Sequence, residues 1–433
     1  MQEKIQKQRE FFRGGKPITL SFRKEALKRL GRTIRAHEEE IYEALRKDLN
    51  KSKTEAYMCE IGMTLAELSY MLKHIDGWAR KRNVLSPIAQ FSSDSFTIRE
   101  PYGVVLIMSP WNYPFMLTIE PLIGAIAAGN CCVVKPSAYA PATSAVICKI
   151  LRECFPEEYV LAVEGGRVEN QALLDQRFDY IFFTGGVTVG KEVMAKAAKH
   201  LTPVTLELGG KSPCVVDRTA KLELAAKRIA FGKLLNCGQT CVAPDYILVE
   251  RSVKDEFLVY LKKWIVRMYG ADATENDAYV KMINQKHFDR VTGLIDPEKV
   301  IFGGDRNERT MQIQPTILDD VTAEDAVMQE EIFGPIFPIL PVDSMAEAEE
   351  FIRKREKPLA LYLFTQNKAL AERFLRYVPF GGGCINDTII HLATSRMGFG
   401  GVGGSGMGSY HGKKSFETVS YTHLRAHETK ANL

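Results

Sequence analysis

Between residues 104 and 206, short apolar runs alternate with longer segments in which apolar residues recur at helical spacing. The runs have no polar face, which is typical of strands covered on both sides of a sheet. Strands that alternate with helices form a parallel sheet, because each helix returns the chain to the same edge. The sequence therefore predicts a doubly wound α/β lobe. Its predicted strands are 104–108, 131–134, 159–163, 180–183 and 204–206, and its predicted helices are 117–128, 142–155, 168–175 and 187–199.

A second α/β succession follows, and the boundary between the two falls near residues 207–210. Ahead of the first lobe, residues 22–78 predict two or three amphipathic helices, and residues 80–101 predict a loop with an exposed β-hairpin. The expected fold is α/β, with two parallel-sheet lobes and a cleft between them. The elements predicted for the second lobe are helix 220–236, strand 246–249, helix 253–269, strand 336–340, helix 345–354 and strand 359–364.

The composition excludes several classes of protein. The 433 residues are 45% apolar and 25% charged, with no apolar stretch long enough to span a membrane, which favours a soluble globular protein. A net charge of +4 without a long basic block argues against nucleic-acid binding. The nine cysteines form no CxxC pair, and the N-terminus lacks an apolar signal core. We therefore expect a cytoplasmic protein without a disulfide framework.

Open α/β sheets bind ligands beyond the carboxyl ends of their strands, so residues that follow the strands are candidates for a site. Asn112 follows the first predicted strand, and Glu207 ends the fifth. Glu207 could act as a general base, and Asn112 could donate a hydrogen bond to an oxyanion. The alternatives are a solvated strand end for Glu207 and an ordinary turn residue for Asn112.

Cys241 lies just after a predicted helix and close to Gly238. A thiol in such a place can be both exposed and activated, and the thiolate is the species that attacks. The alternative is that Cys241 is a small buried hydrophobic residue. Neither a metal site nor a serine hydrolase is expected, because the chain has no HExxH and no GxSxG motif.

Two further features could bind a dinucleotide. The run from Gly185 to Gly190 opens a helix, where glycines let a phosphate approach the backbone N–H groups. An ordinary strand-to-helix turn is the alternative, because the spacing differs from GxGxxG. The GxGxxG match at residues 401–406 is rejected, because no strand precedes it and no helix follows. Glu331 could accept hydrogen bonds from ribose hydroxyls or could form a surface acidic pair with Glu330.

Taken together, six motifs resemble the aldehyde dehydrogenase superfamily in their order and approximate spacing. The resemblance runs from about residue 4 to residue 418, and residues 406–413 resemble the class 3 branch of fatty and aromatic aldehyde dehydrogenases. The motifs are Pro110-Trp111-Asn112-Tyr113-Pro114, Lys135-Pro136-Ser137, Phe183-Thr184-Gly185-Gly186, Leu206-Glu207-Leu208-Gly209-Gly210-Lys211, Gly238-Gln239-Thr240-Cys241 and Glu331-Ile332-Phe333-Gly334-Pro335.

The resemblance implies NAD(P)-dependent oxidation of an aldehyde to a carboxylate. Cys241 would attack the aldehyde carbon, and Asn112 with the Cys241 N–H would hold the oxyanion of the thiohemiacetal. Hydride transfer to nicotinamide would leave a thioester, and a water activated by Glu207 would hydrolyse it.

The resemblance also implies a site for NAD or NADP and a division into domains. Lys135 and Glu331 would bind the two riboses, Phe333 would pack near the nicotinamide, and the glycine-rich run would border the pyrophosphate. The implied cofactor residues are Trp111, Lys135, Gly185, Gly186, Val187, Thr188, Val189, Gly190, Leu208, Glu331 and Phe333. The implied domains are a dinucleotide-binding domain (1–82 and 100–207), an oligomerisation hairpin (83–99), a catalytic domain (208–404) and a C-terminal segment (405–433) returning to the cofactor domain.

Two features depart from the family pattern. Ala138 stands where many NAD-preferring relatives have a glutamate that accepts from the ribose 2′-hydroxyl, so we expect the use of both NAD and NADP. Residues 419–433 resemble foreign sequence, whereas relatives have there a strand that joins a partner subunit. The homodimer that the resemblance implies, and a membrane anchor that some relatives carry, both depend on this region.

Two other functions remain as alternatives. A coenzyme A-acylating enzyme would transfer the thioester to coenzyme A, but Glu207 argues for hydrolysis. A non-catalytic dinucleotide-binding protein would not need the set Asn112, Glu207 and Cys241. The aldehyde itself would be recognised by residues 58–63, 113–117 and 389–394.

Overall fold

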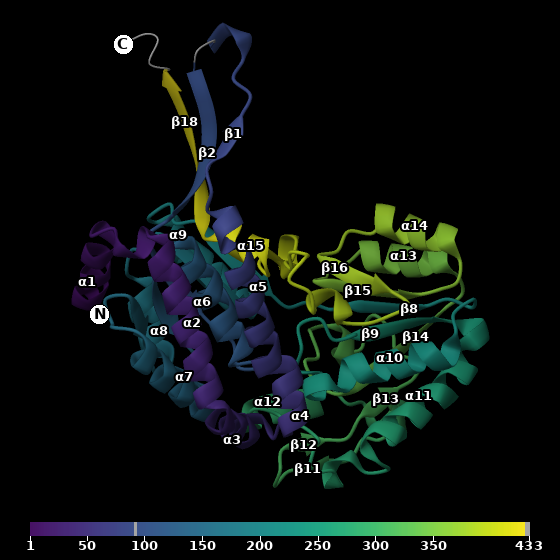
Figure 1. Cartoon of the computed structure of the whole chain (residues 1–433). Coiled ribbons are helices and arrows are strands. Elements are labelled where there is room, and N and C mark those ends of the chain that lie inside the picture. The colour runs from purple at the N-terminus through teal and green to yellow at the C-terminus, as the bar shows by residue number, and fades with distance from the viewer. Residues whose placement is uncertain (91–92, 429–433) are drawn as a thin grey trace.

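The computed structural model describes residues 1–90 and 93–428. It has two lobes, each built on a mostly parallel sheet, and a slender arm that projects from the first lobe (Figure 1). The predicted α/β class with two parallel-sheet lobes is confirmed.

The first sheet has the strand order β17-β7-β6-β3-β4-β5, and only β17 runs antiparallel to its neighbour. All five strands predicted for this lobe are present, with small shifts at their ends, where strands fray. Their bounds are β3 (Val104–Met108), β4 (Cys131–Lys135), β5 (Val160–Ala162), β6 (Tyr180–Gly185) and β7 (Val204–Leu208), and the sixth strand is β17 (Gly406–Met407).

Helices cover both faces of this sheet. One of them, α6 (Met116–Ala128), is buried over its whole length, which explains why it is apolar apart from Thr118 and Glu120. The other helices between the strands are α7 (Pro141–Cys154), α8 (Arg167–Leu174) and α9 (Val187–Ala198). The N-terminal helices are α1 (Gln2–Arg13), α2 (Leu20–Ala36), α3 (Glu38–Leu49), α4 (Lys53–Ala56) and α5 (Gly62–Trp78), with a π-helical turn at Tyr57–Ile61 between the last two.

The second sheet has the order β10-β13-β14-β9-β8-β15-β16, with β10 antiparallel to β13. The sequence predicted β9 (Tyr246–Glu250), β14 (Ile336–Val342) and β15 (Ala360–Phe364). It missed β8 (Pro213–Val216), β10 (Val300–Phe302), β13 (Thr316–Leu318) and β16 (Gly382–Ile385), which are too short to show a periodic pattern. Around the sheet lie α10 (Leu222–Leu234), α11 (Lys254–Tyr269), α12 (Gln285–Thr292), α13 (Met345–Arg353) and α14 (Lys368–Tyr377), and a small pair is formed by β11 (Arg306–Asn307) and β12 (Gln312–Ile313).

The arm differs from the predicted hairpin, because it has a third strand. β1 (Arg82–Val84) and β18 (Ser420–Glu428) pair with opposite edges of β2 (Ser93–Pro101), and all three strands are antiparallel. The short helix α15 (Lys413–Thr418) leads into β18. Sequence reasoning missed this pairing because its partners lie at opposite ends of the chain. The foreign origin of residues 419–433 stays a prediction, and residues 429–433 lie outside the described part of the chain.

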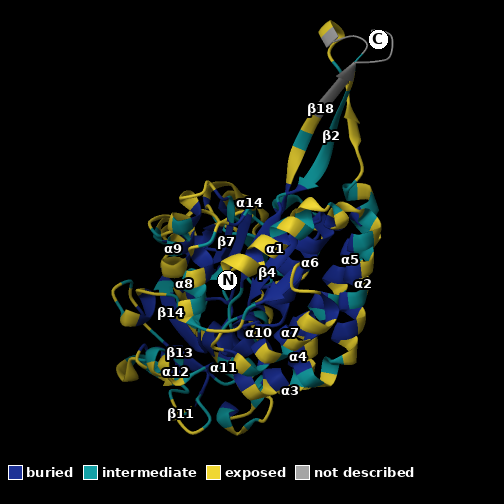
Figure 2. Cartoon of the chain, turned by 90° about the vertical axis from the view of Figure 1, so that its left-hand side faces the viewer, coloured by how far each residue is buried: buried dark blue, intermediate teal, exposed yellow. Residues whose placement is uncertain are grey.

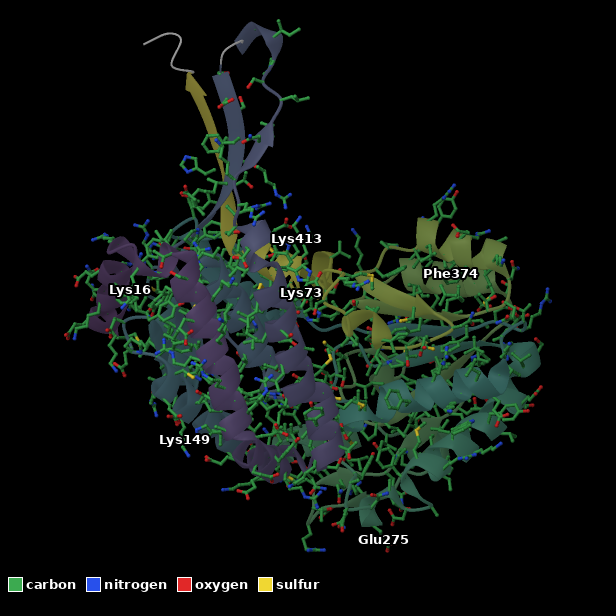
Figure 3. All side chains as sticks on the ribbon, in the orientation of Figure 1. Lys16, Lys73, Lys149, Glu275, Phe374 and Lys413 are labelled. Atoms are coloured by element: carbon green, nitrogen blue, oxygen red, sulfur yellow. The ribbon has the colours of Figure 1, made fainter. Side chains whose placement is uncertain are left out.

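Burial separates the arm from the lobes. Buried residues concentrate on the sheets and the helix faces against them, whereas most residues of the arm whose burial the structure describes are exposed or half-buried, and only its base at Pro101 and Ser420 is buried (Figure 2). Lys149 and Glu275 extend outward from the surface, while Phe374 of α14 is fully buried (Figure 3). Among the described residues, no helix is both long and apolar enough to cross a membrane.

Candidate active site

Cys241 opens into an apolar cavity of about 310 Å³. The helix before it ends at Leu234 and continues as a 3₁₀ turn, in which Asn236 and Cys237 adopt left-handed backbone angles. Cys241 itself is half-buried, and its side chain faces this cavity. The expectation of an exposed thiol is therefore corrected, because the thiol does not face open solvent.

All three segments that the sequence suggested would recognise the aldehyde contribute to the walls of this cavity, which are completed by residues of α10, the Cys241 loop and residues 399–411. The polar residues among them are Tyr113, Thr240, Tyr410 and His411, and the Tyr113 and Thr240 hydroxyls hydrogen-bond to each other at 2.6 Å. The apolar lining includes Met58, Cys59, Met63, Met116, Leu117, Ile389, Ile390, Leu392 and Ala393. The cavity therefore favours an apolar ligand.

Glu207 ends β7 and is only 3% exposed, which excludes a solvated strand end. Neither of its carboxylate oxygens has a hydrogen-bond partner within the described residues. Burial raises the pKa of Glu207 well above its ordinary value. When ionised, this carboxylate is a stronger base than an exposed glutamate.

The electrostatics around Cys241 favour the neutral thiol. Burial raises the pKa of the Cys241 thiol, and the negative charges of Glu331 and Glu207 raise it further. Both carboxylates therefore lie within electrostatic range of the sulfur. A thiolate at this site requires that a base take the proton as the reaction proceeds.

Asn112 is buried in the loop after β3, and its side chain points to the loop that carries Cys241. Its Nδ2 donates to the backbone oxygen of Gln239 at 3.0 Å. Because a carboxamide NH₂ has two donors, the second hydrogen remains for another acceptor. The backbone oxygen of Asn112 accepts from Asn236 Nδ2 at 2.8 Å and from Lys51 Nζ at 3.0 Å.

Sequence reasoning missed Lys51 and its partner Glu60. Their side chains are 0% exposed and form an ion pair of 2.6 Å beside the Asn112 loop. In the sequence they look like two charged residues in an amphipathic helical region, which are usually solvated. No pattern of residues signals that both face inward.

The glycine-rich run lies where an anion could bind. β6 ends at Gly185, α9 begins at Val187, and no side chain caps this helix N-terminus. Val187, Thr188 and Val189 are exposed, as is Gly186. Their backbone N–H groups, at the positive end of the helix dipole, suit a pyrophosphate. Gly190 and Leu208 lie against each other, since a Cβ at residue 190 would come within 2.6 Å of Leu208 Cδ2.

Lys135 is the last residue of β4, which is separated from β6 by β3, and Ala138 lies just beyond the end of β4. The Lys135 side chain is buried, and its Nζ donates to the Pro136 carbonyl at 2.8 Å. Burial lowers the pKa of Lys135. Ala138 is exposed and leaves this part of the rim without a carboxylate.

Glu331 lies beside Gly209, where any side chain would collide with its carboxylate. Glu331 is half-buried, so a fully solvated acidic pair with Glu330 is excluded. Burial, followed by the charge of Asp245, raises the pKa of Glu331 to about 8. The rings of Trp111 and Phe333 meet edge-on, with centroids 5.3 Å apart.

Among the described residues, no group of three histidine, cysteine or acidic side chains is arranged to hold a metal ion. The GxGxxG match at residues 401–406 includes a short 3₁₀ turn and the start of β17, and no helix opens from it. The features suited to a dinucleotide therefore gather at the ends of β4, β6 and β7.

Comparison with known proteins identifies the class of this fold and site. The model of the aldehyde dehydrogenase family matches residues 1–424. The chain therefore belongs to the aldehyde dehydrogenase family, as its motifs predicted. It is an oxidoreductase that oxidises aldehydes with NAD or NADP.

Individual relatives cover nearly the whole chain. The 4,4'-diaponeurosporen-aldehyde dehydrogenase of Staphylococcus aureus is 47% identical over 433 residues, which are 100% of this chain and 94% of that protein. A dimeric, NADP-preferring aldehyde dehydrogenase of Canis lupus familiaris is 46% identical, with 97% and 92% of the two chains covered. The solved structure of substrate-bound Staphylococcus aureus AldH superposes with a TM-score of 0.98 at 46% identity, covering 99% and 94%.

Proposed function

We propose that this enzyme oxidises apolar aldehydes to carboxylates through a thioester on Cys241. The observation that carries the proposal is the apolar cavity in which the Cys241 thiol ends, with the unpartnered Glu207 carboxylate within electrostatic range. An aldehyde in this cavity is held against the thiol and away from bulk water.

The first step is attack of the Cys241 sulfur on the aldehyde carbon. A base takes the thiol proton as the carbon–sulfur bond forms, because burial keeps the resting thiol neutral. The carbonyl oxygen becomes an oxyanion, and the second N–H of Asn112 Nδ2 and the backbone N–H of Cys241 stabilise it. NAD or NADP, when bound, would supply the acceptor for the hydride that the tetrahedral adduct on Cys241 loses, and Cys241 would be left as a thioester.

Glu207 acts in the second step. Its ionised carboxylate removes a proton from a water molecule, and the water oxygen attacks the thioester carbon. The carbon–sulfur bond breaks, the carboxylate product forms and the thiol is restored. Because burial raises the pKa of Glu207, we expect turnover to increase as the pH rises through that elevated pKa.

The cofactor residues carry the roles that the family resemblance implies. The open N-terminus of α9 would bind the pyrophosphate, and Lys135 and Glu331 would bind the adenine-side and nicotinamide-side riboses. Phe333 would pack near the nicotinamide end, and Trp111 and Leu208 would be further cofactor contacts. The absence of a carboxylate at Ala138 supports the use of both cofactors.

Trapping the covalent intermediate tests the proposal. We expect the Glu207→Gln variant, mixed with NAD and a straight-chain aldehyde, to accumulate a protein whose mass is increased by the acyl group on the Cys241 peptide. The Cys241→Ser variant is the control and should give no thioester. An inactive Glu207→Gln variant that carries no acyl group would contradict the assigned role of Glu207, and acyl-CoA formed by the wild type with coenzyme A would favour the transferase alternative.

Chain length tests the substrate class. Each methylene buried in an apolar cavity contributes about 0.8 kcal/mol, so kcat/KM should rise about fourfold per carbon until the cavity is full. Aldehydes that carry a charged group should be poor substrates. A preference for short or charged aldehydes would contradict this assignment.

We also propose that the enzyme is a cytoplasmic homodimer that associates through its arm. The relative from Canis lupus familiaris is named as dimeric, and Leu85 and Ile88 are almost fully exposed near the end of the arm. All nine cysteines are unpaired, as expected in a reducing compartment. Light scattering on the wild type and on the double variant Leu85→Ser/Ile88→Ser tests whether the enzyme is a dimer that associates through the arm. Cell fractionation tests the cytoplasmic location.

A further inference from the structure

Three charged residues of one short segment lie buried beside the candidate active site. The segment runs from Lys51 through α4 and the π-helical turn, and the three residues are Lys51, Glu55 and Glu60. Burying charged groups is costly unless each is paired or hydrogen-bonded. All three bind backbone groups of the two loops that carry Asn112 and Cys241, so the segment connects these loops.

The π-helical turn explains how Glu60 joins this group. Glu60 follows Glu55 by five residues, whereas the residue one α-helical turn after Glu55 is Cys59. A π-helical turn closes after five residues and so brings Glu60 to the same side as Glu55. Cys59 and Met58 then line the aldehyde cavity. The same turn therefore shapes the cavity wall and holds the buried carboxylate.

Lys51 and Glu60 hold the Asn112 loop from both of its ends. Lys51 Nζ donates to the backbone oxygen of Asn112 at 3.0 Å and lies 4.2 Å from the centre of the Tyr113 ring. Glu60 Oε2 accepts from the backbone N–H groups of Phe115 and Met116 at 3.0 and 2.9 Å. The ion pair therefore fixes the backbone on both sides of Tyr113.

Glu55 connects the same segment to the loop that carries the nucleophile. Its Oε1 accepts from the backbone N–H of Asn236 at 2.7 Å. Asn236 in turn donates to the backbone oxygens of Asn112 and Gln239. The position of the Asn112 carboxamide relative to Cys241 is thus set by charged groups that do not line the cavity.

We propose that the buried Lys51–Glu60 ion pair positions Asn112 for its contact with the oxyanion. Lys51 and Glu60 are positioning residues, because neither touches the aldehyde and both act through the backbone of residues 112–116. This inference rests on the proposed role of Asn112. Loss of either partner moves the carboxamide without removing it, and a displacement of about 1 Å in such a group can lower the rate about 100-fold.

A double-mutant cycle tests the proposal. The variants are Lys51→Met, Glu60→Gln, Asn112→Ala and each of the first two combined with Asn112→Ala, assayed with NAD and a straight-chain aldehyde. We expect Lys51→Met and Glu60→Gln each to lower kcat/KM about 10- to 100-fold in the presence of Asn112. In the Asn112→Ala background, the same changes should alter kcat/KM by less than about twofold, because residues that act as one unit are not additive.

Asp179 provides a matched control at the opposite end of the sheet. It pairs with Arg9 at 3.0 Å and accepts from the Val104 backbone N–H at 2.8 Å, at the start of β3. Asp179→Asn should lower the melting temperature and leave kcat/KM unchanged. The rate at which iodoacetamide alkylates Cys241, measured on its peptide, should be the same in Glu60→Gln as in the wild type, which shows that the thiol and its cavity are intact.

The outcomes separate this inference from the proposed function. If the ion-pair variants lower kcat/KM equally with and without Asn112, the inference is overturned and the role of Asn112 stands. If Asn112→Ala keeps wild-type kcat/KM, the role of Asn112 is wrong. A single variant can fail to fold because it leaves one unpaired charge buried. In that case the double variant Lys51→Met/Glu60→Gln, which removes both charges, takes the place of the single variant in the cycle.

Discussion

The two sides of Cys241 are built in different ways. On the aldehyde side, buried side chains form an apolar cavity whose wall is fixed by a fully buried ion pair. On the cofactor side, exposed backbone N–H groups and glycines at Gly185–Gly190 form an open rim. Under the proposed mechanism, the covalent step takes place in the enclosed apolar cavity, whereas the cofactor binds to backbone groups that are already open to solvent.

The largest expected effect lies between the two sides. Cys241→Ser should lower kcat by at least about 1,000-fold, because a serine hydroxyl gives up its proton far less readily than a thiol and is a weaker nucleophile. NAD binding, measured by calorimetry, should change little, since no cofactor contact is assigned to the Cys241 side chain. Substantial remaining activity would show that the aldehyde side does not depend on a covalent bond.

Glu207→Gln should slow turnover about 100-fold or more, because hydrolysis of the thioester loses its base. A stopped-flow burst of reduced cofactor, equal to one per active site, should remain. The elevated pKa of Glu207 also predicts that the wild-type kcat rises with pH, and this rise should disappear in the variant. A variant that loses the burst as well would place Glu207 in the first step.

The cofactor side should show its own pH dependence through Glu331. With a pKa of about 8, Glu331 becomes ionised between pH 7 and 9 and then accepts stronger hydrogen bonds from ribose. The KM for NAD should therefore fall several-fold over this interval, and Glu331→Gln should remove the change. Without ligand the folded state holds the proton between the ordinary value of 4.5 and 8, so this group lowers stability as the pH rises across that window. Melting curves of the variant should accordingly depend less on pH.

The smallest expected effect concerns cofactor choice at the exposed rim. Ala138→Glu should lower kcat/KM for NADP about threefold through repulsion of the 2′-phosphate, while kcat/KM for NAD stays within about twofold. Because the residue is exposed, screening by salt limits the effect. In the wild type, a kcat/KM for NADP several hundredfold below that for NAD would contradict the use of both cofactors.

The fold was predictable where elements are long and apolar. The strands of the first lobe were found because each is buried on both faces, and the buried helix α6 was found because nearly all of its residues are apolar. Strands of three or four residues in the second lobe carry too little pattern. The third strand of the arm could not be predicted, since pairing between residues 93–101 and 420–428 depends on the whole fold.

The candidate site was predictable to the extent that its residues follow strands or form motifs. Cys241, Glu207 and Asn112 stand at such positions, and the structure places Asn112 against the Cys241 loop and Glu207 within electrostatic range of the thiol. Their mechanistic roles stay predictions. Lys51 and Glu60 escaped notice because a lysine and a glutamate nine residues apart look solvated in the sequence, and nothing in the sequence signals the π-helical turn that contains Glu60 or the buried ion pair with Lys51.

The apolar lining of the cavity also bears on how the reaction ends. An aldehyde enters as a neutral molecule, but the carboxylate that replaces it carries a charge, and a charged group among side chains such as Met116 and Leu117 is strongly disfavoured. If the substrate is an apolar aldehyde as proposed, the cavity therefore binds the neutral compound that enters better than the charged compound that is made. Such a difference in binding limits inhibition by accumulated product.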